Sequence, residues 1–366
     1  MIDTRTVNIA EPDISDLEKN YIMEAMDSNE LSTGRFVSRF EEAFAGFCEV
    51  PHAASCMNGT VALHLALIGA GVQAGDEVIV PALTYVSTAN AVVHAGAKPV
   101  FADVHPRHWG LDPDEVTKKI TPKTKAIIVV HLYGHPADMD PLINICSEKG
   151  IILIEDAAEA HGARYKGKLV GGIAPLGTFS FFGNKILTTG EGGMVTCRDK
   201  SIVDKINVYK NHGNDPQRQY QHQVIGFNYR MTNLQAAIGL AQVERSGDLL
   251  VKKKKIAMRY EVGLKGLPCK MQPKMDWAQP VNWMNCLVLE DSCLTSDYVQ
   301  NRLRMLGVDT RPFFIPLPNL KIYDDPSVYP IAEHLSQHGI NLPSSTKLSD
   351  EDLDYTVECI REILGS

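Results

Sequence analysis

The sequence predicts an α/β fold with a mainly parallel central sheet flanked by helices, followed by a smaller C-terminal α+β domain. Between about residues 61 and 198, short apolar runs of strand length alternate with stretches of helical periodicity. That order is typical of a parallel sheet covered on both faces. After about residue 266, strand-like and helical pieces mix without this alternation. A chain of 366 residues is also long enough for two domains.

Two amphipathic helices are predicted ahead of the sheet, within residues 13–47. Apolar residues recur there at helical spacing on both sides of the break at Ser32-Thr33-Gly34. They are Leu17, Tyr21, Ile22 and Met26 before the break, and Phe36, Phe40 and Phe44 after it.

The alternating region provides the predicted sheet. Strands are expected at residues 77–80, 99–102, 126–130, 151–154, 178–182 and 194–196. Helices are expected between them, at residues 61–68, 87–93 and 141–148.

A long helix is predicted to start at Asn233 and to continue beyond Lys255. The strand at 286–289 and the helices at 296–306 and 350–363 then form the smaller domain. We therefore expect the N-terminal helices and the large α/β domain in residues 1–245, and the long linking helix with the small α+β domain in residues 246–366. The four lysines at 252–255 are expected to form a solvated helix face.

Composition excludes several classes of protein. The formal net charge of −8 argues against a nucleic-acid binder, and no apolar run approaches the roughly 18 residues of a membrane span. Charged residues at 3, 5, 11 and 13 stand where a signal peptide would be apolar. None of the eight cysteines forms a C-x-x-C pair, so no structural metal is expected. We predict a cytoplasmic protein with reduced cysteines and no nucleic-acid or membrane partner.

Two positions are candidates for ligand binding. Asn58-Gly59-Thr60 opens a predicted helix, where free backbone N–H groups can bind phosphate, although most such turns are only helix caps. Asp156 follows the apolar run at 151–154, so it lies at the carboxyl end of a buried strand. An acid there can hold a metal, a ribose or a protonated ring nitrogen, or it can cap the next helix.

Lys185 is the candidate nucleophile. It lies between the aromatic stretch at 179–182 and the glycine-rich turn at 190–193. Such a site can desolvate the amine, lower its pKa and make it nucleophilic. The ordinary alternative is a solvent-facing lysine.

Taken together, six ordered motifs resemble the DegT/StrS-like sugar aminotransferase family of fold-type-I pyridoxal 5′-phosphate (PLP) enzymes. They are Asn58-Gly59-Thr60, Pro81-Ala82-Leu83-Thr84-Tyr85, Val130-His131-Leu132-Tyr133-Gly134, Glu155-Asp156-Ala157-Ala158-Glu159-Ala160, Phe179-Ser180-Phe181-Phe182-Gly183-Asn184-Lys185 and Gly226-Phe227-Asn228-Tyr229-Arg230-Met231-Thr232-Asn233. The resemblance covers nearly the whole chain and implies the fold-type-I transferase fold, with the cofactor bound in the large domain.

The resemblance also implies a role for each site residue. Lys185 would be the catalytic residue, carrying PLP as a Schiff base and then moving a proton. Asp156 would pair with the pyridinium nitrogen. The other cofactor contacts would be Gly59, Thr60 and Ser180 at the phosphate, Tyr85 on the ring face, Glu159 near the ring hydroxyl, and Asn228 reaching the phosphate across a homodimer interface. Arg230 is a candidate for an anionic group of the substrate or for the interface.

Within the family, the motifs around Lys185 are most similar to those of the GDP-perosamine synthase group. This implies glutamate as the amino donor and a keto-sugar acceptor, GDP-4-keto-6-deoxymannose first among them. The products of such enzymes serve surface polysaccharides, including the O-antigen of lipopolysaccharide.

Four short segments depart from the family pattern, namely Ala174-Pro175, Tyr220-Gln221, Asn282-Trp283 and residues 311–319 with no histidine. All are expected where the sugar or its nucleotide binds, so other acceptors stay open. These are a 3-deoxy-octulosonate keto-sugar, another nucleotide-linked keto-sugar, or a small phosphorylated ketone.

Two other functions compete with the transaminase. A sugar dehydratase on the same scaffold would have histidine in place of Lys185. A catalytically silent PLP-fold protein that acts in regulation or binding would not need Lys185, Asp156 and Tyr85 together.

Overall fold

A seven-stranded sheet forms the centre of the structure, a computed structural model that describes residues 5–290 and 294–365. The strand order is β1-β9-β8-β5-β4-β2-β3, and within it β9 alone runs antiparallel to its neighbours. The strands are β1 (His52–Cys56), β2 (Glu77–Pro81), β3 (Lys98–Ala102), β4 (Thr124–Val130), β5 (Ile152–Asp156), β8 (Leu176–Ser180) and β9 (Gly193–Cys197). The predicted α/β class is confirmed, while the sequence analysis missed β1.

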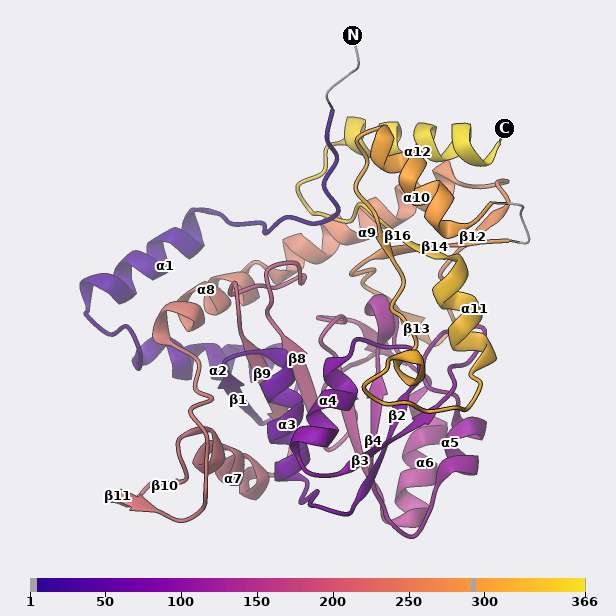
Figure 1. Cartoon of the computed structure of the whole chain (residues 1–366). Coiled ribbons are helices and arrows are strands. Elements are labelled where there is room, and N and C mark those ends of the chain that lie inside the picture. Colours follow the sequence, from indigo (N-terminus) through magenta and orange to yellow (C-terminus); the bar gives the residue numbers. More distant parts are fainter. Residues whose placement is uncertain (1–4, 291–293, 366) are drawn as a thin grey trace.

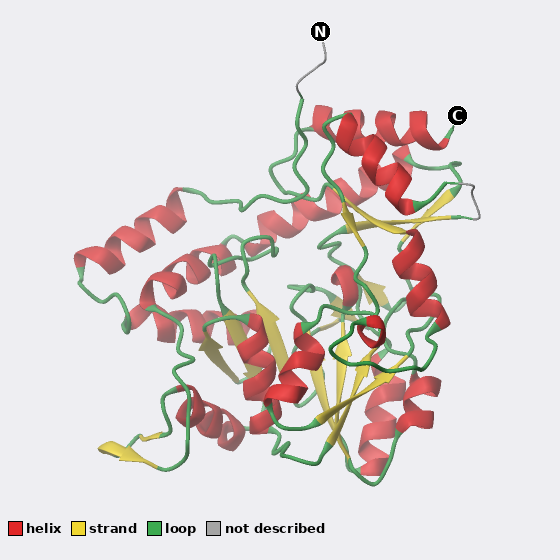
Figure 2. Ribbon diagram, in the orientation of Figure 1, coloured by secondary structure: helices red, strands yellow, loops and turns green. Residues whose placement is uncertain are grey.

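Helices cover both faces of this sheet (Figure 2). Successive side chains of a strand point to opposite faces, so Val78 and Val80 of β2 join one hydrophobic cluster and Ile79 joins another. One face packs against helices that include α3 (Gly59–Gly69), α4 (Ser87–His94) and α7 (Lys200–Lys210). The other packs against α5 (Pro113–Lys119) and α6 (Met139–Lys149). Burial on both faces explains why these strands are continuous apolar runs.

The two predicted N-terminal helices are α1 (Asp16–Asp27) and α2 (Arg35–Phe47), and both pack against α8 (Asn233–Glu244) (Figure 1). Phe40 and Phe44 of α2 are fully buried. Each of their rings lies 5.1 Å from the ring of Phe181, just after β8. The helices therefore support the segment that leads to Lys185.

The predicted long helix after Asn233 is broken at Arg245, so that prediction is wrong in detail. Arg245 ends α8, and α9 (Ser246–Gly263) begins at the next residue. Its guanidinium donates to Glu18 Oε1 at 2.6 Å and to Asp13 Oδ1 at 2.8 Å. Because these partners lie more than 220 residues away, no local pattern marks the break.

The prediction of a solvated lysine face on α9 is also wrong at one position. Lys252, Lys254 and Lys255 are exposed, but Lys253 is 3% exposed. Its ammonium donates to the carbonyl oxygens of Trp283 and Ser344, both at 2.6 Å. Burial lowers the pKa of Lys253 to about 7. A run of identical residues thus divides between solvent and core according to the helical period.

The C-terminal part contains its own antiparallel sheet, β12-β14-β16-β15. Its strands are β12 (Cys269–Met271), β14 (Asn285–Leu289), β15 (Arg311–Pro312) and β16 (Gly339–Leu342), and its helices are α10 (Ser296–Met305), α11 (Pro330–His338) and α12 (Asp350–Leu364). Side chains from residues 256–364 form a separate hydrophobic cluster. We keep the division near residue 245 as a proposal, with one refinement. Val7 pairs with Val308, so the first described residues lie with the C-terminal part.

Two small sheets complete the fold. Strands β13 (Ala278–Gln279), β6 (Arg164–Tyr165) and β7 (Lys168–Leu169) form one, which connects the C-terminal part to the segment between β5 and β8. Strands β10 (Asn214–Asp215) and β11 (Arg218–His222) form a hairpin that projects from the body (Figure 1). Short 3₁₀ helices lie at Leu132–Gly134 and Leu317–Asn319.

Two general observations bear on the predicted environment. Within residues 5–290 and 294–365, no helix combines the length and the apolar character that a membrane span requires. Seven cysteines in that part of the chain have free thiols. Cys293 and Asp3, which entered the sequence analysis, lie outside the described residues.

We predict that Asp13→Asn destabilises the protein near neutral pH. Burial raises the pKa of Asp13, but hydrogen bonds from Lys252, Arg245 and Thr346 outweigh it and lower the pKa to about 2. A carboxylate with a lowered folded-state pKa stabilises the fold above its unfolded-state pKa, and that stabilisation is lost as the pH falls from about 4 to 2. The expected loss is about 1 kcal/mol at pH 7. Urea unfolding at pH 7 and at pH 3 measures it, and an equal loss at both would contradict the argument.

Candidate active site

A cavity of about 350 Å³ lies where the parallel strands end. Residues that follow β1, β2, β5 and β8 line it together with three residues of the C-terminal part. The lining is Asn58, Gly59, Thr60, Leu63, Thr84, Tyr85, Ser87, Thr88, Val130, Asp156, Ala158, Glu159, Ser180, Phe182, Asn184, Lys185, Glu191, Trp283, Arg311 and Phe314. Seven of the eight predicted cofactor contacts are in this set, so the fold brings them together from distant parts of the sequence.

One end of the cavity suits a phosphate group. The side chain of Asn58 caps α3 by accepting a hydrogen bond from Val61 N at 3.0 Å. The N–H groups of Gly59 and Thr60 lie in the first turn of the helix, where they have no partner within the helix. A side chain at position 59 would place its Cβ 2.7 Å from the Cβ of Ser180, so only glycine fits against that hydroxyl. Backbone N–H groups at a helix start, with nearby hydroxyls, form an anion site.

Asp156 ends β5 and faces the same cavity. Its Oδ2 accepts from Thr88 Oγ1 at 2.9 Å and its Oδ1 accepts from Ala158 N at 3.2 Å. Burial raises the pKa of this carboxyl, although these two hydrogen bonds and the charge of Lys185 oppose the change. A buried acid of this kind is stabilised as a carboxylate when a cationic group is bound beside it.

Lys185 lies in the turn after β8, and its side chain is 11% exposed. The backbone N–H of Lys185 donates to the Phe182 carbonyl at 2.9 Å, which closes the turn. Its Nζ lies 3.7 Å from Glu159 Oε1. Burial lowers the pKa of the amine, while Glu159 and Asp156 act in the opposite direction. A lysine with a lowered pKa is available as a neutral nucleophile.

Glu159 completes the polar set. Its Oε2 accepts from the N–H of Tyr133 at 2.8 Å. Burial raises its pKa to about 7, despite the nearby Lys185 ammonium. Glu159 can therefore take up or release a proton near neutral pH, in the same cavity as Lys185 and Asp156.

Aromatic side chains form the other wall. Tyr85 is 56% exposed, and its ring lies 5.7 Å from that of Phe314 at a tilt of 58°. The ring of Trp283 lies over Lys185, with Nζ 3.7 Å from the ring centroid. Arg311 also lines the cavity.

Asn228 and Arg230 do not line this cavity. Both are exposed, and the Arg230 guanidinium donates to Asn228 Oδ1 at 3.1 and 3.2 Å. They lie after the β10–β11 hairpin, outside the site of their own chain. Their roles toward cofactor and substrate remain predictions.

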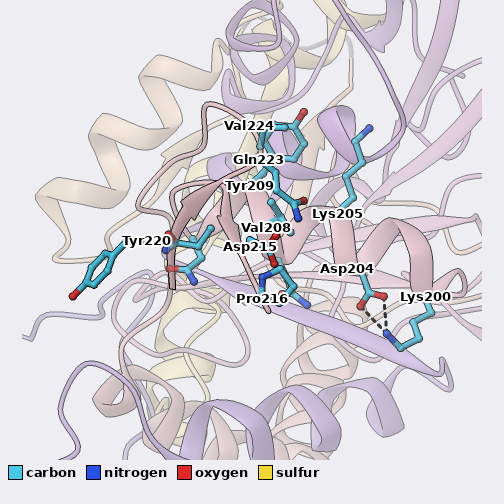
Figure 3. Close-up of a pocket in the computed structure, with 13 residues that line it drawn as sticks. Lys200, Asp204, Lys205, Val208, Tyr209, Asp215, Pro216, Tyr220, Gln223 and Val224 are labelled. Atoms are coloured by element: carbon cyan, nitrogen blue, oxygen red, sulfur yellow. Dashed lines mark hydrogen bonds and ion pairs between the residues drawn. The ribbon is translucent and has the colours of Figure 1, made fainter. Parts of the chain in front are cut away.

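A second hollow, of about 1080 Å³, lies between α7 and that hairpin (Figure 3). The Lys200–Asp204 ion pair borders it, and Tyr220 extends away from the other labelled side chains. None of the predicted site residues lines it, so we place the chemistry in the first cavity.

Sequence reasoning missed several residues of the site. Thr88 had no signal beyond its place at the start of a predicted helix, yet its hydroxyl binds Asp156. Trp283, Arg311 and Phe314 occur in segments that had been noted as departures from the family, which was a usable signal. Their approach to Lys185 depends on how the C-terminal part packs, which no local pattern reveals.

The departure at Ala174-Pro175 is not where it was expected. These residues precede β8, at the opposite edge of the sheet from Ser180. The N–H of Ala174 donates at 2.7 Å to Glu155, a buried carboxylate that also contacts His131. Ala174-Pro175 therefore lies away from the cavity and contacts Glu155, a residue of β5.

The residues present fit PLP, the cofactor implied by the resemblance. The helix start beside Ser180 provides donors for a phosphate, Asp156 provides a buried carboxylate for a cationic ring nitrogen, and Lys185 provides a buried amine. Tyr85 and Phe314 supply flat surfaces beside them. An anion site, a buried carboxylate and a nucleophilic amine in one cavity are the groups that PLP requires.

Comparison with known proteins agrees with this geometry. The chain is 43% identical over 373 residues to GDP-perosamine synthase from Caulobacter vibrioides, covering 100% of both chains. It is 42% identical to GDP-perosamine synthase from Escherichia coli O157:H7, covering 97% of this chain and 98% of the relative.

Solved structures are similar over the same length. DesV from S. venezuelae superposes with a TM-score of 0.91 at 33% identity, covering 95% of this chain and 94% of DesV. The PLP form of Spr1654 from Streptococcus pneumoniae gives a TM-score of 0.93 at 28% identity, covering 99% of both chains. The protein is a PLP-dependent sugar aminotransferase with the fold that the resemblance implied. Since the family pattern matches residues 12–361, the chain belongs to the DegT/DnrJ/EryC1/StrS aminotransferase family.

Proposed function

We propose that this aminotransferase moves an amino group from glutamate to C4 of GDP-4-keto-6-deoxymannose, for the synthesis of a surface polysaccharide such as O-antigen. The observation that carries the proposal is full-length similarity to three GDP-perosamine synthases at 39–43% identity. The motifs around Lys185 point the same way.

Each cavity residue has a role in the proposed reaction. When bound, PLP supplies an aldehyde carbon that takes up the amino group and a conjugated ring that withdraws electrons. The Gly59 and Thr60 N–H groups and the Ser180 hydroxyl would bind the phosphate, and Tyr85 would pack on the ring face. Asp156 would accept a hydrogen bond from the protonated ring nitrogen and keep the proton there.

Lys185 has two tasks in this proposal. Its neutral amine would hold the cofactor, and its Nζ would take up a proton and release it again beside the reacting carbon atoms. The 3.7 Å between Nζ and Glu159 places a second proton acceptor beside it. Since the pKa of Glu159 is near 7, this carboxyl helps to set the protonation state of the amine near neutral pH.

We further propose a homodimer in which Asn228 of one subunit completes the phosphate site of the other. Asn228 is exposed and lies outside the cavity of its own chain. The adjoining hairpin projects from the body (Figure 1), and Tyr220 and Ile225 there are 84% and 92% exposed. Large apolar side chains on a projecting segment are typical of an interface.

A cytoplasmic location is part of the same proposal. The seven described cysteines carry free thiols, and six of them are buried. Thiols of this kind persist in a reducing compartment.

The identity of the acceptor can be tested by half-reactions. The enzyme is converted to its aminated form with glutamate, and free donor is removed. Candidate keto-sugars are then added, and recovery of the original visible absorbance is followed. We expect the fastest recovery with GDP-4-keto-6-deoxymannose. Faster recovery with a 3-deoxy-octulosonate keto-sugar, another nucleotide keto-sugar or a small phosphorylated ketone would reassign the acceptor.

Lys185→Ala should abolish transamination and leave the fold intact. The substitution removes the amine that binds the cofactor and carries the proton, so turnover should fall by about 10⁴-fold or more. Borohydride reduction followed by mass spectrometry should find the cofactor on the peptide of residue 185 in the wild type only. Substantial turnover by the purified variant would remove Lys185 from its assigned role.

Asp156→Asn should be folded, bind PLP and turn over about 10²- to 10³-fold more slowly. An amide of the same size cannot hold the proton on the ring nitrogen, and the lost charge matters most in the transition state. Rates of the glutamate half-reaction and thermal melting should be measured together. A residue that only holds Thr88 would give the opposite result, with normal rates and lower stability.

The shared site can be tested by mixing inactive variants. We expect sedimentation at twice the 40.3 kDa chain mass. Lys185→Ala and Asn228→Asp should each be nearly inactive alone, the second because a carboxylate repels phosphate. Unfolding and refolding the two together should restore activity, since one site of each mixed dimer has neither change. No recovery in verified mixed dimers would place Asn228 in the site of its own chain.

A further inference from the structure

Trp283 makes two contacts with the segment that carries the catalytic lysine. Its Nε1 donates to the carbonyl oxygen of Asn184 at 2.7 Å. Its ring lies under the ammonium of Lys185, with Nζ 3.7 Å from the centroid. A cation over an indole face is stabilised by the ring quadrupole, and more so in a site with little water. Trp283 is 6% exposed, so both contacts are shielded.

The main chain of Trp283 is held tightly from two sides. On one side lies the 3₁₀ turn Leu132–Gly134, where a Cβ on Gly134 would come within 2.7 Å of Trp283 N. The Gly134 carbonyl accepts from Val281 N at 3.0 Å. On the other side, the ammonium of Lys253 donates to Trp283 O at 2.6 Å. Asn282 between these contacts has a φ of 48°, so the chain bends sharply there.

Lys253 has no contact with the cavity, yet it is the anchor of this arrangement. It extends from α9 into the interior and bridges Trp283 O and Ser344 O. The Ser344 hydroxyl in turn accepts from Asn285 N at 2.9 Å, just beyond Trp283. Removing the Lys253 ammonium would leave two buried carbonyl oxygens without a donor, and such groups are costly to leave unpaired.

From this chain of contacts, we propose that Trp283 is a positioning residue for Lys185 and that Lys253 acts through Trp283 to hold it there. The C-terminal part thereby controls the orientation and the proton affinity of an amine that belongs to the large sheet. Glu159 and Asp156 act on the same amine, so two carboxylates and an indole ring together set the surroundings of Lys185. The inference rests on the proposed role of Lys185, but not on the identity of the acceptor.

The test measures Lys185 in the protein without cofactor. The chain is labelled with acetic anhydride over a range of pH, and the labelling rate of each lysine is followed by mass spectrometry. In Lys253→Met and in Trp283→Phe, we expect the apparent pKa of Lys185 to fall by about half a unit or more, because the indole no longer stabilises the ammonium. The double variant should show the same fall as the single variants, since both changes remove one contact.

Lys254→Met is the matched control. Lys254 is the next residue on α9 and is exposed, so this change should leave the labelling profile of Lys185 and the turnover as in the wild type. In the holoenzyme, Trp283→Phe and Lys253→Met should lower kcat by about tenfold with little change in KM for glutamate.

Two results would overturn the proposal. One is an unchanged pH dependence of Lys185 labelling in Trp283→Phe. This variant keeps an aromatic ring and leaves Lys253 in place, so it should fold. The other is a Lys253→Met variant with a lower melting temperature but a normal profile, which would make Lys253 only a structural residue. Neither result depends on whether the enzyme transaminates a particular sugar, so failure of the proposed acceptor would be recognised separately.

Discussion

Parallel strands end at the same edge of a sheet, and the active site depends on that constraint. Asp156 and Ser180 end neighbouring parallel strands, and the helix start at Gly59 follows a third strand beside the same edge. Residues that are about 120 positions apart thus line one cavity without a dedicated scaffold of their own. Helix α2 supports this edge through the rings of Phe40 and Phe44, which pack against Phe181.

The charges in the cavity form a second, linked constraint. One amine and two carboxylates are buried together, and the amine of Lys185 and each carboxylate change one another's proton affinity. Burial alone would disfavour all three charges, while the attraction of Lys185 to each carboxylate and the hydrogen bond from Thr88 to Asp156 offset part of that cost. The result is a lysine with a lowered pKa beside a carboxyl that titrates near 7. Such a set is suited to moving protons at neutral pH.

The C-terminal part closes the site from the other side. Trp283, Arg311 and Phe314 enter the cavity from segments that follow or join the antiparallel sheet. These three side chains bring the C-terminal part into the same cavity as Lys185 and Asp156. The buried Lys253 shows that the connection extends into the interior of that part.

The sequence by itself determined the α/β class and most strands of the sheet, and it predicted seven residues that line the cavity. Strands that are buried on both faces must be apolar along their whole length, so they can be recognised in the sequence. The motifs around Asn58, Asp156 and Lys185 are continuous stretches of sequence, so they can be recognised without the structure. Only the tertiary structure decided the break at Arg245, the burial of Lys253, the hydrogen bond from Thr88 to Asp156 and the approach of Trp283 to Lys185. Each of these depends on partners 30 to more than 200 residues away, and a local pattern of polarity contains no record of such contacts.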